Sequence, residues 1–288
     1  MEEPLSEPEL VSLPDGRRIE CHIYGDPDGF PIVYCHGGLS SPIDIAFASD
    51  EARSRAVKIV APARPGIGRS DRARDREVAD WAGDVAAVTA AFGLSRFSML
   101  GWSAGGPFAL ACAALLPERV VRIATVGGMA PLQPPLAAEQ LGLRLDQLLF
   151  PLSARHRGLA SLVVRGSKVV PARAVRSSLL RVLPAEDRVV VEAMAPAEAA
   201  AGTRDAVRHG PGGVVDDYAI LGRDWGFPLA DVALDVTVFQ GSADTLLPRA
   251  HAEALAHQLP TGNLEVVEGA GHFLLHSHLG RVIDALVI

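Results

Sequence analysis

The sequence predicts an α/β fold: a mostly parallel central sheet flanked by helices, with a helical cap inserted into it. Short apolar runs alternate with longer helical patterns in the first half of the chain, which is typical of βαβ units. The alternation stops at about residue 131, where only helical periodicity continues, and it resumes after residue 222. One α/β core interrupted by a helical insertion explains this order.

The elements follow in sequence. A hairpin strand is expected over 17–24, because the turn Pro14-Asp15-Gly16 precedes it. The expected buried strands before the insertion are 32–35, 58–61, 97–101 and 120–126, and the expected helices are 43–56, 77–92 and 104–116. After the insertion we expect a strand at 236–240, a helix at 248–258, a strand at 264–267 and a final helix. The core therefore comprises 1–130 and 223–288, and the cap 131–222.

Composition narrows the functional classes. The chain has 288 residues, a net charge of -7 and 49% hydrophobic residues, without a Lys/Arg run that could follow a phosphate backbone, so nucleic-acid binding is not expected. No apolar stretch reaches the roughly 18 residues of a membrane span, and the acidic segment Met1–Leu10 does not resemble a signal peptide. Cys21, Cys35 and Cys112 are odd in number and widely spread, which favours reduced thiols in a cytoplasmic protein.

The strongest motif is G-W-S-A-G-G at residues 101–106, between an expected strand and an expected helix. A nucleophile on such a tight turn needs small neighbours two residues before and after it, and Gly101 and Gly105 meet that demand. The amides at the start of the following helix would favour a developing oxyanion beside Ser103. The structural alternative is a simple helix N-cap made by glycine and serine.

A serine nucleophile needs a base, and the base needs an orienting acid. His272 lies in the glycine turn 269–273, just after an expected strand, and Asp244 directly follows the strand that ends at Gln240. Both positions place the side chains at the carboxyl edge of the sheet. The chain order Ser, Asp, His is the order that this type of fold requires.

With these motifs the sequence resembles the α/β-hydrolases, from about Leu13 to the C-terminus outside the insertion. The resemblance implies a catalytic triad of Ser103, Asp244 and His272. It also implies an oxyanion hole formed by the backbone N–H groups of Gly38, in the H-G-G-L segment 36–39, and of Ala104. Leu39 is the alternative first donor.

Other residues near these motifs receive structural or pocket roles. Leu39 and Trp102 are expected to line the substrate pocket. His36 is interpreted as holding its loop by hydrogen bonds, and Arg64 as bracing loops. The remaining histidines considered as bases are expected on helix surfaces: His251, His276 and His278.

No metal-ligand spacing, dinucleotide fingerprint or phosphate loop is found, so no cofactor and no metal are expected. Residues 144–181 carry many arginines but only one acid, Asp146. This indicates either a solvated face or attraction of an anionic substrate or partner; in the case of a substrate, Arg173 and Arg176 are expected to contribute.

The predicted activity is hydrolysis of a small to medium carboxylic ester, or an amide, through an acyl-enzyme. A proline-iminopeptidase-like enzyme is an alternative within the class, with Asp216 and Asp217 as candidates to bind the substrate amine. A ligand sensor, a lyase and a cofactor-free oxygenase are the non-hydrolytic alternatives that the triad alone does not exclude. A homodimer is also left open.

Overall fold

The computed structural model describes residues 7–287 and contains an eight-stranded sheet in the order β1-β2-β4-β3-β5-β6-β7-β8. Strand β2 pairs antiparallel with β1 and β4, and all other neighbouring strands are parallel. The predicted α/β fold class is confirmed. Residues 1–6 of the acidic N-terminal segment lie outside the described residues. The strands are β1 (Glu9–Ser12), β2 (Arg18–Gly25), β3 (Phe30–Cys35), β4 (Val57–Pro62), β5 (Phe97–Trp102), β6 (Val120–Val126), β7 (Val236–Gly241) and β8 (Gly262–Val267).

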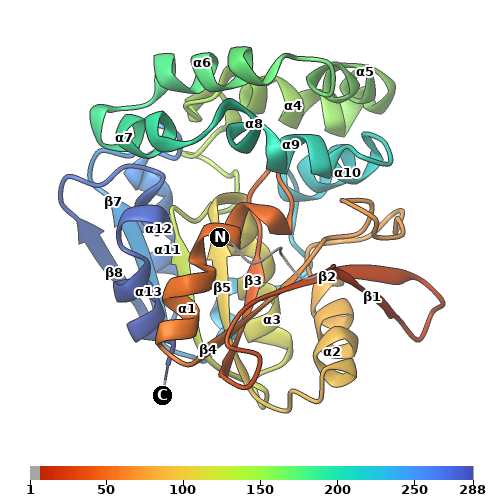
Figure 1. The fold of residues 1–288 in the computed structure, drawn as a ribbon, viewed down its shortest axis with the longest axis vertical. Helices are drawn as coiled ribbons and strands as arrows, with labels where there is room; N and C mark the ends of the chain where they lie inside the picture. The colour runs from red at the N-terminus through yellow and green to blue at the C-terminus, as the bar shows by residue number, and fades with distance from the viewer. Residues whose placement is uncertain (1–6, 288) are drawn as a thin grey trace.

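Helices cover both faces of this sheet (Figure 1). Alternate side chains of one strand point to opposite faces, so Val33 and Cys35 pack in one apolar cluster while Ile32 and Tyr34 pack in the other. The first cluster includes residues of α2 (Trp81–Ala91), α3 (Gly106–Leu115) and α11 (Arg249–Gln258). The second includes residues of α1 (Ser49–Ser54), α12 (Leu274–Ser277) and α13 (Leu279–Leu286).

Two expected helices differ in detail. The segment expected as one helix over 43–56 is a 3-10 helix, Pro42–Ala48, followed by the short α1. The helix expected from residue 77 begins only at Trp81. The residues before it are held in a turn, because Glu77 N–H donates to Asp80 and Ala79 N–H donates to the distant Trp225 carbonyl.

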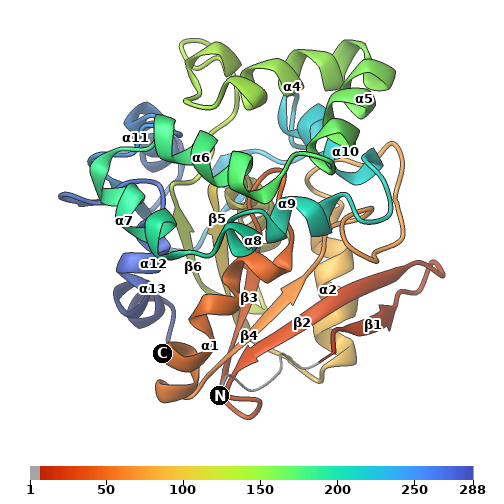
Figure 2. The ribbon, with the colours of Figure 1, turned by 45° about the horizontal axis from the view of Figure 1, so that its top comes forward.

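Between β6 and β7 the chain forms a layer of seven α-helices, here called the helical layer, which lies across the top of the sheet in Figure 1 and is turned toward the viewer in Figure 2. No helix in the described part of the chain is long and apolar enough to cross a membrane. The helices of the layer are α4 (Arg144–Arg155), α5 (Arg157–Ser167), α6 (Ala172–Val182), α7 (Ala185–Ala193), α8 (Pro196–Ala199), α9 (Ala201–Ala206) and α10 (Gly212–Leu221).

Candidate active site

Ser103 occupies a strained turn between β5 and α3. Its φ is +55°, in the left-handed region that non-glycine residues seldom adopt. A Cβ at Gly105 would lie 2.0 Å from the Cys35 carbonyl oxygen, and a Cβ at Gly101 would lie 2.7 Å from Gly106 Cα. Both glycines are therefore required by close backbone contacts, as the motif predicted, and they allow a turn that leaves Ser103 only half-buried.

His272 and Asp244 are brought together at the carboxyl ends of β8 and β7. His272 Nδ1 lies 2.8 Å from Asp244 Oδ2. The other carboxylate oxygen of Asp244, Oδ1, accepts hydrogen bonds from the backbone N–H groups of Leu246 at 2.8 Å and Leu247 at 2.9 Å. Gly127, with φ +51°, leaves room for this pair, since a Cβ there would lie 3.1 Å from His272 Nδ1.

His272 and Asp244 each stabilise the charged form of the other. Burial alone would lower the pKa of His272, but the charge of Asp244 and its hydrogen bond outweigh that effect and raise the pKa above 6.5. For Asp244, burial alone would raise the pKa, and His272 together with the backbone donors lowers it. Within residues 7–287 no direct hydrogen bond joins His272 to Ser103, although both line one cavity. Such contacts commonly tighten only when substrate is bound.

Asp187 is a site residue that the sequence analysis missed. This carboxylate comes from α7 of the helical layer and is 1% exposed. It accepts the backbone N–H groups of His272 and Phe273, both at 2.8 Å. A Cβ at Gly271 would lie 2.3 Å from the Asp187 carboxylate carbon, so the glycine permits the contact. The turn that carries His272 is therefore anchored from the helical layer, and Trp102 Nε1 also donates to the His272 carbonyl at 3.1 Å.

The residues expected to form the oxyanion hole lie side by side. A Cβ at Gly38 would lie 3.3 Å from Ala104 Cβ, and a Cβ at Gly37 would lie 3.8 Å from Ser103 Cβ. For the Gly38 N–H, no hydrogen-bond acceptor is found among residues 7–287. The alternative donor, Leu39, adopts a left-handed φ of +47°. Backbone amides at this position suit an oxyanion because they are already in place before reaction.

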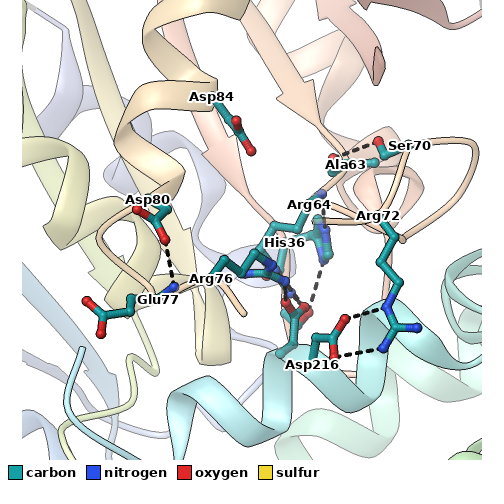
Figure 3. A network of polar contacts seen from close by, with 12 residues as sticks. His36, Ala63, Arg64, Ser70, Arg72, Arg76, Glu77, Asp80, Asp84 and Asp216 are labelled. Atoms are coloured by element: carbon teal, nitrogen blue, oxygen red, sulfur yellow. Dashed lines mark hydrogen bonds and ion pairs between the residues drawn. The ribbon is translucent and has the colours of Figure 1, made fainter. Parts of the chain in front are cut away.

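The loop before Gly38 is held by a buried ion-pair network (Figure 3). Arg64 donates through its side chain to the carbonyl oxygens of His36 at 2.5 Å and Gly37 at 2.9 Å, and its backbone N–H donates to His36 Nε2. Arg64 Nε donates to Asp217 Oδ2 at 2.8 Å, so the Asp217 carboxylate neutralises the Arg64 charge. Burial and the nearby Arg64 charge hold the pKa of His36 well below 6.5. His36 is therefore a neutral structural residue, as expected, and Arg64 braces the loop.

The same network removes two candidates. Asp216 accepts from Arg72 at 2.6 Å, and Asp217 binds both Arg64 and Arg76. Neither carboxylate lines the cavity beside Ser103. Asp216 and Asp217 are paired inside the protein and do not face a substrate amine.

A cavity of about 560 Å³ connects the site to the helical layer. Leu39 and Trp102, which were expected to line the substrate pocket, both line this cavity. The site residues that line it are Gly38, Leu39, Trp102, Ser103, Ala104 and His272. A separate cavity of about 460 Å³ near Trp225 contains none of these residues.

Two of the histidines expected on helix surfaces are not there. His251 is fully buried, and its Nδ1 accepts the Ala130 backbone N–H at 3.2 Å. His276 lines the cavity and stacks on Phe47, with 3.6 Å between ring centroids. The sequence did not reveal these contacts, because their partners, Ala130 and Phe47, lie far away along the chain.

The charges that line the cavity are acidic. Asp44, Asp146 and Glu198 are among the residues that line it, whereas none of the described lysines or arginines does. Arg176 donates to carbonyl oxygens of α7 residues, and Arg173 is exposed outside the cavity. The arginines of the helical layer therefore do not point at the site, which does not support their attraction of an anionic substrate. Among residues 7–287, no group of three or more His, Cys, Asp and Glu side chains could hold a metal ion.

A family model described as the alpha/beta hydrolase fold matches residues 31–279. The chain belongs to the α/β-hydrolase family. It is 27% identical over 286 residues to a 2-hydroxymuconate semialdehyde hydrolase of Pseudomonas putida, covering 98% of this chain and 94% of that protein. A thermophilic esterase from Thermogutta terrifontis shares the fold with a TM-score of 0.70 and 18% identity, over 97% of this chain and 96% of that one. A proline iminopeptidase of Neisseria gonorrhoeae is 34% identical over 103 residues, covering 33% of this chain and 32% of that protein.

Membership agrees with the resemblance seen in the sequence. The similarity to proteins named hydrolase supports an enzyme of the α/β-hydrolase kind. The structural likeness to the esterase concerns the fold, since its identity is low.

Proposed function

We propose that this enzyme hydrolyses a small to medium carboxylic ester through an acyl-enzyme on Ser103. His272 Nε2 takes the proton of the Ser103 hydroxyl while Oγ attacks the carbonyl carbon, and Asp244 stabilises the imidazolium that forms. The N–H groups of Gly38 and Ala104 bind the tetrahedral oxyanion. Its collapse expels the alcohol, which receives the proton from His272, and water then repeats the sequence to release the acid.

One observation carries this proposal: Ser103 and His272 line the same cavity, and Asp244 Oδ2 lies 2.8 Å from His272 Nδ1. The strained φ of Ser103 supports a nucleophile exposed for attack rather than a helix N-cap. A cavity of about 560 Å³ is within the usual size range for small-molecule sites.

The helical layer is proposed to act as the cap, comprising residues 131–222 of the chain, with 1–130 and 223–288 as the core. Side chains of α4, α6, α8 and α10 line the cavity opposite the nucleophile. Most of these are apolar, among them Phe150, Val175 and Leu179. Such a cap would select substrates by the shape of their acyl or alcohol part.

Pre-steady-state hydrolysis of a series of 4-nitrophenyl esters tests this proposal. An initial burst of 4-nitrophenolate close to one equivalent per enzyme, followed by slower turnover, indicates an acyl-enzyme. Ser103→Ala should abolish both phases. Turnover that persists in Ser103→Ala, or stabilisation by ligands without turnover in the wild type, would contradict the esterase and favour a non-hydrolytic member or a ligand sensor.

A further inference from the structure

A second polar pair lies in the cavity beside the proposed oxyanion hole. Tyr218 of α10 is 4% exposed, and its hydroxyl donates a hydrogen bond to Asp146 Oδ1 of α4. Both residues line the same cavity as Ser103. The acyl-transfer steps proposed above use neither of them.

The Tyr218 hydroxyl of this pair lies close to Gly38. A Cβ on Gly38 would lie 3.2 Å from the Tyr218 hydroxyl oxygen and 3.3 Å from Ala104 Cβ. The hydroxyl therefore lies against the residue proposed to bind the oxyanion. A substrate group within a few bonds of the scissile carbonyl can reach Tyr218 and Asp146.

One carboxylate oxygen of Asp146 is free to accept a hydrogen bond. Its Oδ2 has no hydrogen-bond donor among residues 7–287, and no described lysine or arginine lines the cavity around it. Burial raises the pKa of Asp146 above its usual value, although the Tyr218 hydrogen bond and the charge of His272 oppose that effect. No described lysine or arginine offsets this cost of burial, and the negative charge of Asp146 opposes an oxyanion forming nearby.

We propose that the Asp146–Tyr218 pair is a subsite for a protonated amine of the substrate, within a few bonds of the scissile ester carbonyl. This inference rests on the proposed esterase function. An ammonium group would pair with the free Asp146 oxygen and cancel its repulsion of the oxyanion. The wall around the pair is aromatic, since Phe150 lines the cavity and packs edge-on against the Tyr218 ring, 4.9 Å between centroids. Aromatic rings at such a site add cation–π attraction.

Two pairs of isosteric esters test the subsite. Ethyl N,N-dimethylglycinate is compared with ethyl 3-methylbutanoate, and 2-(dimethylamino)ethyl acetate with 3-methylbutyl acetate. For each pair we measure the kcat/KM of the ammonium ester divided by the kcat/KM of its neutral isostere. The ratio obtained for the wild type is then divided by the ratio obtained for Asp146→Asn. This division removes the intrinsic reactivity of each ester. For at least one pair we expect a value of about 10 to 100, the range of a hydrogen bond to a charged group.

Asp50→Asn is the matched control, because it removes the same charge from a fully exposed side chain. It should leave the ratio unchanged. A quotient near 1 for both ester pairs, or an equal loss in Asp50→Asn, overturns the subsite.

Binding to Ser103→Ala gives a test that needs neither turnover nor a folded Asp146 variant. Titration calorimetry should show at least about tenfold tighter binding of one ammonium ester than of its neutral isostere. Equal or tighter binding of both neutral esters would refute the subsite. If the wild type hydrolyses no ester, the proposed function fails, whereas this binding preference still decides the subsite.

Discussion

Removing the Asp187 carboxylate, which lies outside the proposed triad, should slow catalysis. Asp187 holds the turn of His272 through two backbone hydrogen bonds of 2.8 Å, and it comes from the helical layer rather than from the sheet. In Asp187→Ala both N–H groups lose their acceptor, and the His272 ring loses one of the constraints on its position. Asp187 thus acts as a positioning residue.

The size of the effect follows from the contacts. Hydrogen bonds to charged groups are worth roughly 1.5–3 kcal/mol each, so the two together give about 3–6 kcal/mol. Burial raises the pKa of Asp187, which means that the ionised form is itself disfavoured and part of this energy is offset. A net loss of about 2–3 kcal/mol from the productive arrangement lowers kcat by roughly 30- to 150-fold. KM should change little, because the substrate cavity does not include Asp187.

Steady-state hydrolysis of a 4-nitrophenyl ester measures both constants. Asp205→Ala is the matched control, since Asp205 is another buried carboxylate of the helical layer but pairs with Arg208 and not with the histidine turn. A second measurement is the pH profile. The Asp187 charge contributes to the raised pKa of His272. The rising limb of the curve of kcat/KM against pH should therefore move to lower pH in Asp187→Asn. A kcat within twofold of the wild type and an unmoved limb would refute the positioning role.

Three further outcomes are expected. Because His272 must be neutral to act as base and its pKa is raised above 6.5, the kcat/KM for an aryl ester should fall as the pH drops through that pKa. Asp244→Asn should lower kcat by about 10³- to 10⁴-fold, and it should move this fall in kcat/KM to lower pH. Gly105→Ala should prevent acylation, because its Cβ would meet the Cys35 carbonyl at 2.0 Å, whereas Gly83→Ala, with no atom within 4 Å, should retain it in the same burst assay. Arg173→Gln should leave the kcat/KM ratio of a carboxylate-bearing to a neutral ester unchanged, since Arg173 lies outside the cavity.

The sheet and the elbow could be predicted from the sequence because their determinants are local. Apolar runs mark the strands, and Gly101 and Gly105 are required by contacts within a few residues or with the adjacent strand. The strand ends also placed Asp244 and His272 at one edge, since parallel strands share their carboxyl edge.

The contacts that the helical layer makes with the site could not be predicted in the same way. Asp187 reaches His272 across 85 residues, and Tyr218 reaches Asp146 across 72. These contacts depend on how the helices of the layer pack on one another and on the sheet. Helical periodicity identifies an apolar face but not its partner, so Asp146 appeared only as the single acid among many arginines.

Intact-protein mass spectrometry after incubation with a fluorophosphonate tests the central claim most directly. The reagent reacts with a serine only when a base activates it, so it reports on Ser103 and His272 without knowledge of the substrate. We predict a single adduct in the wild type, its absence in Ser103→Ala, and much slower formation in His272→Ala. An adduct that persists in Ser103→Ala, or no adduct in the wild type, would contradict an activated Ser103.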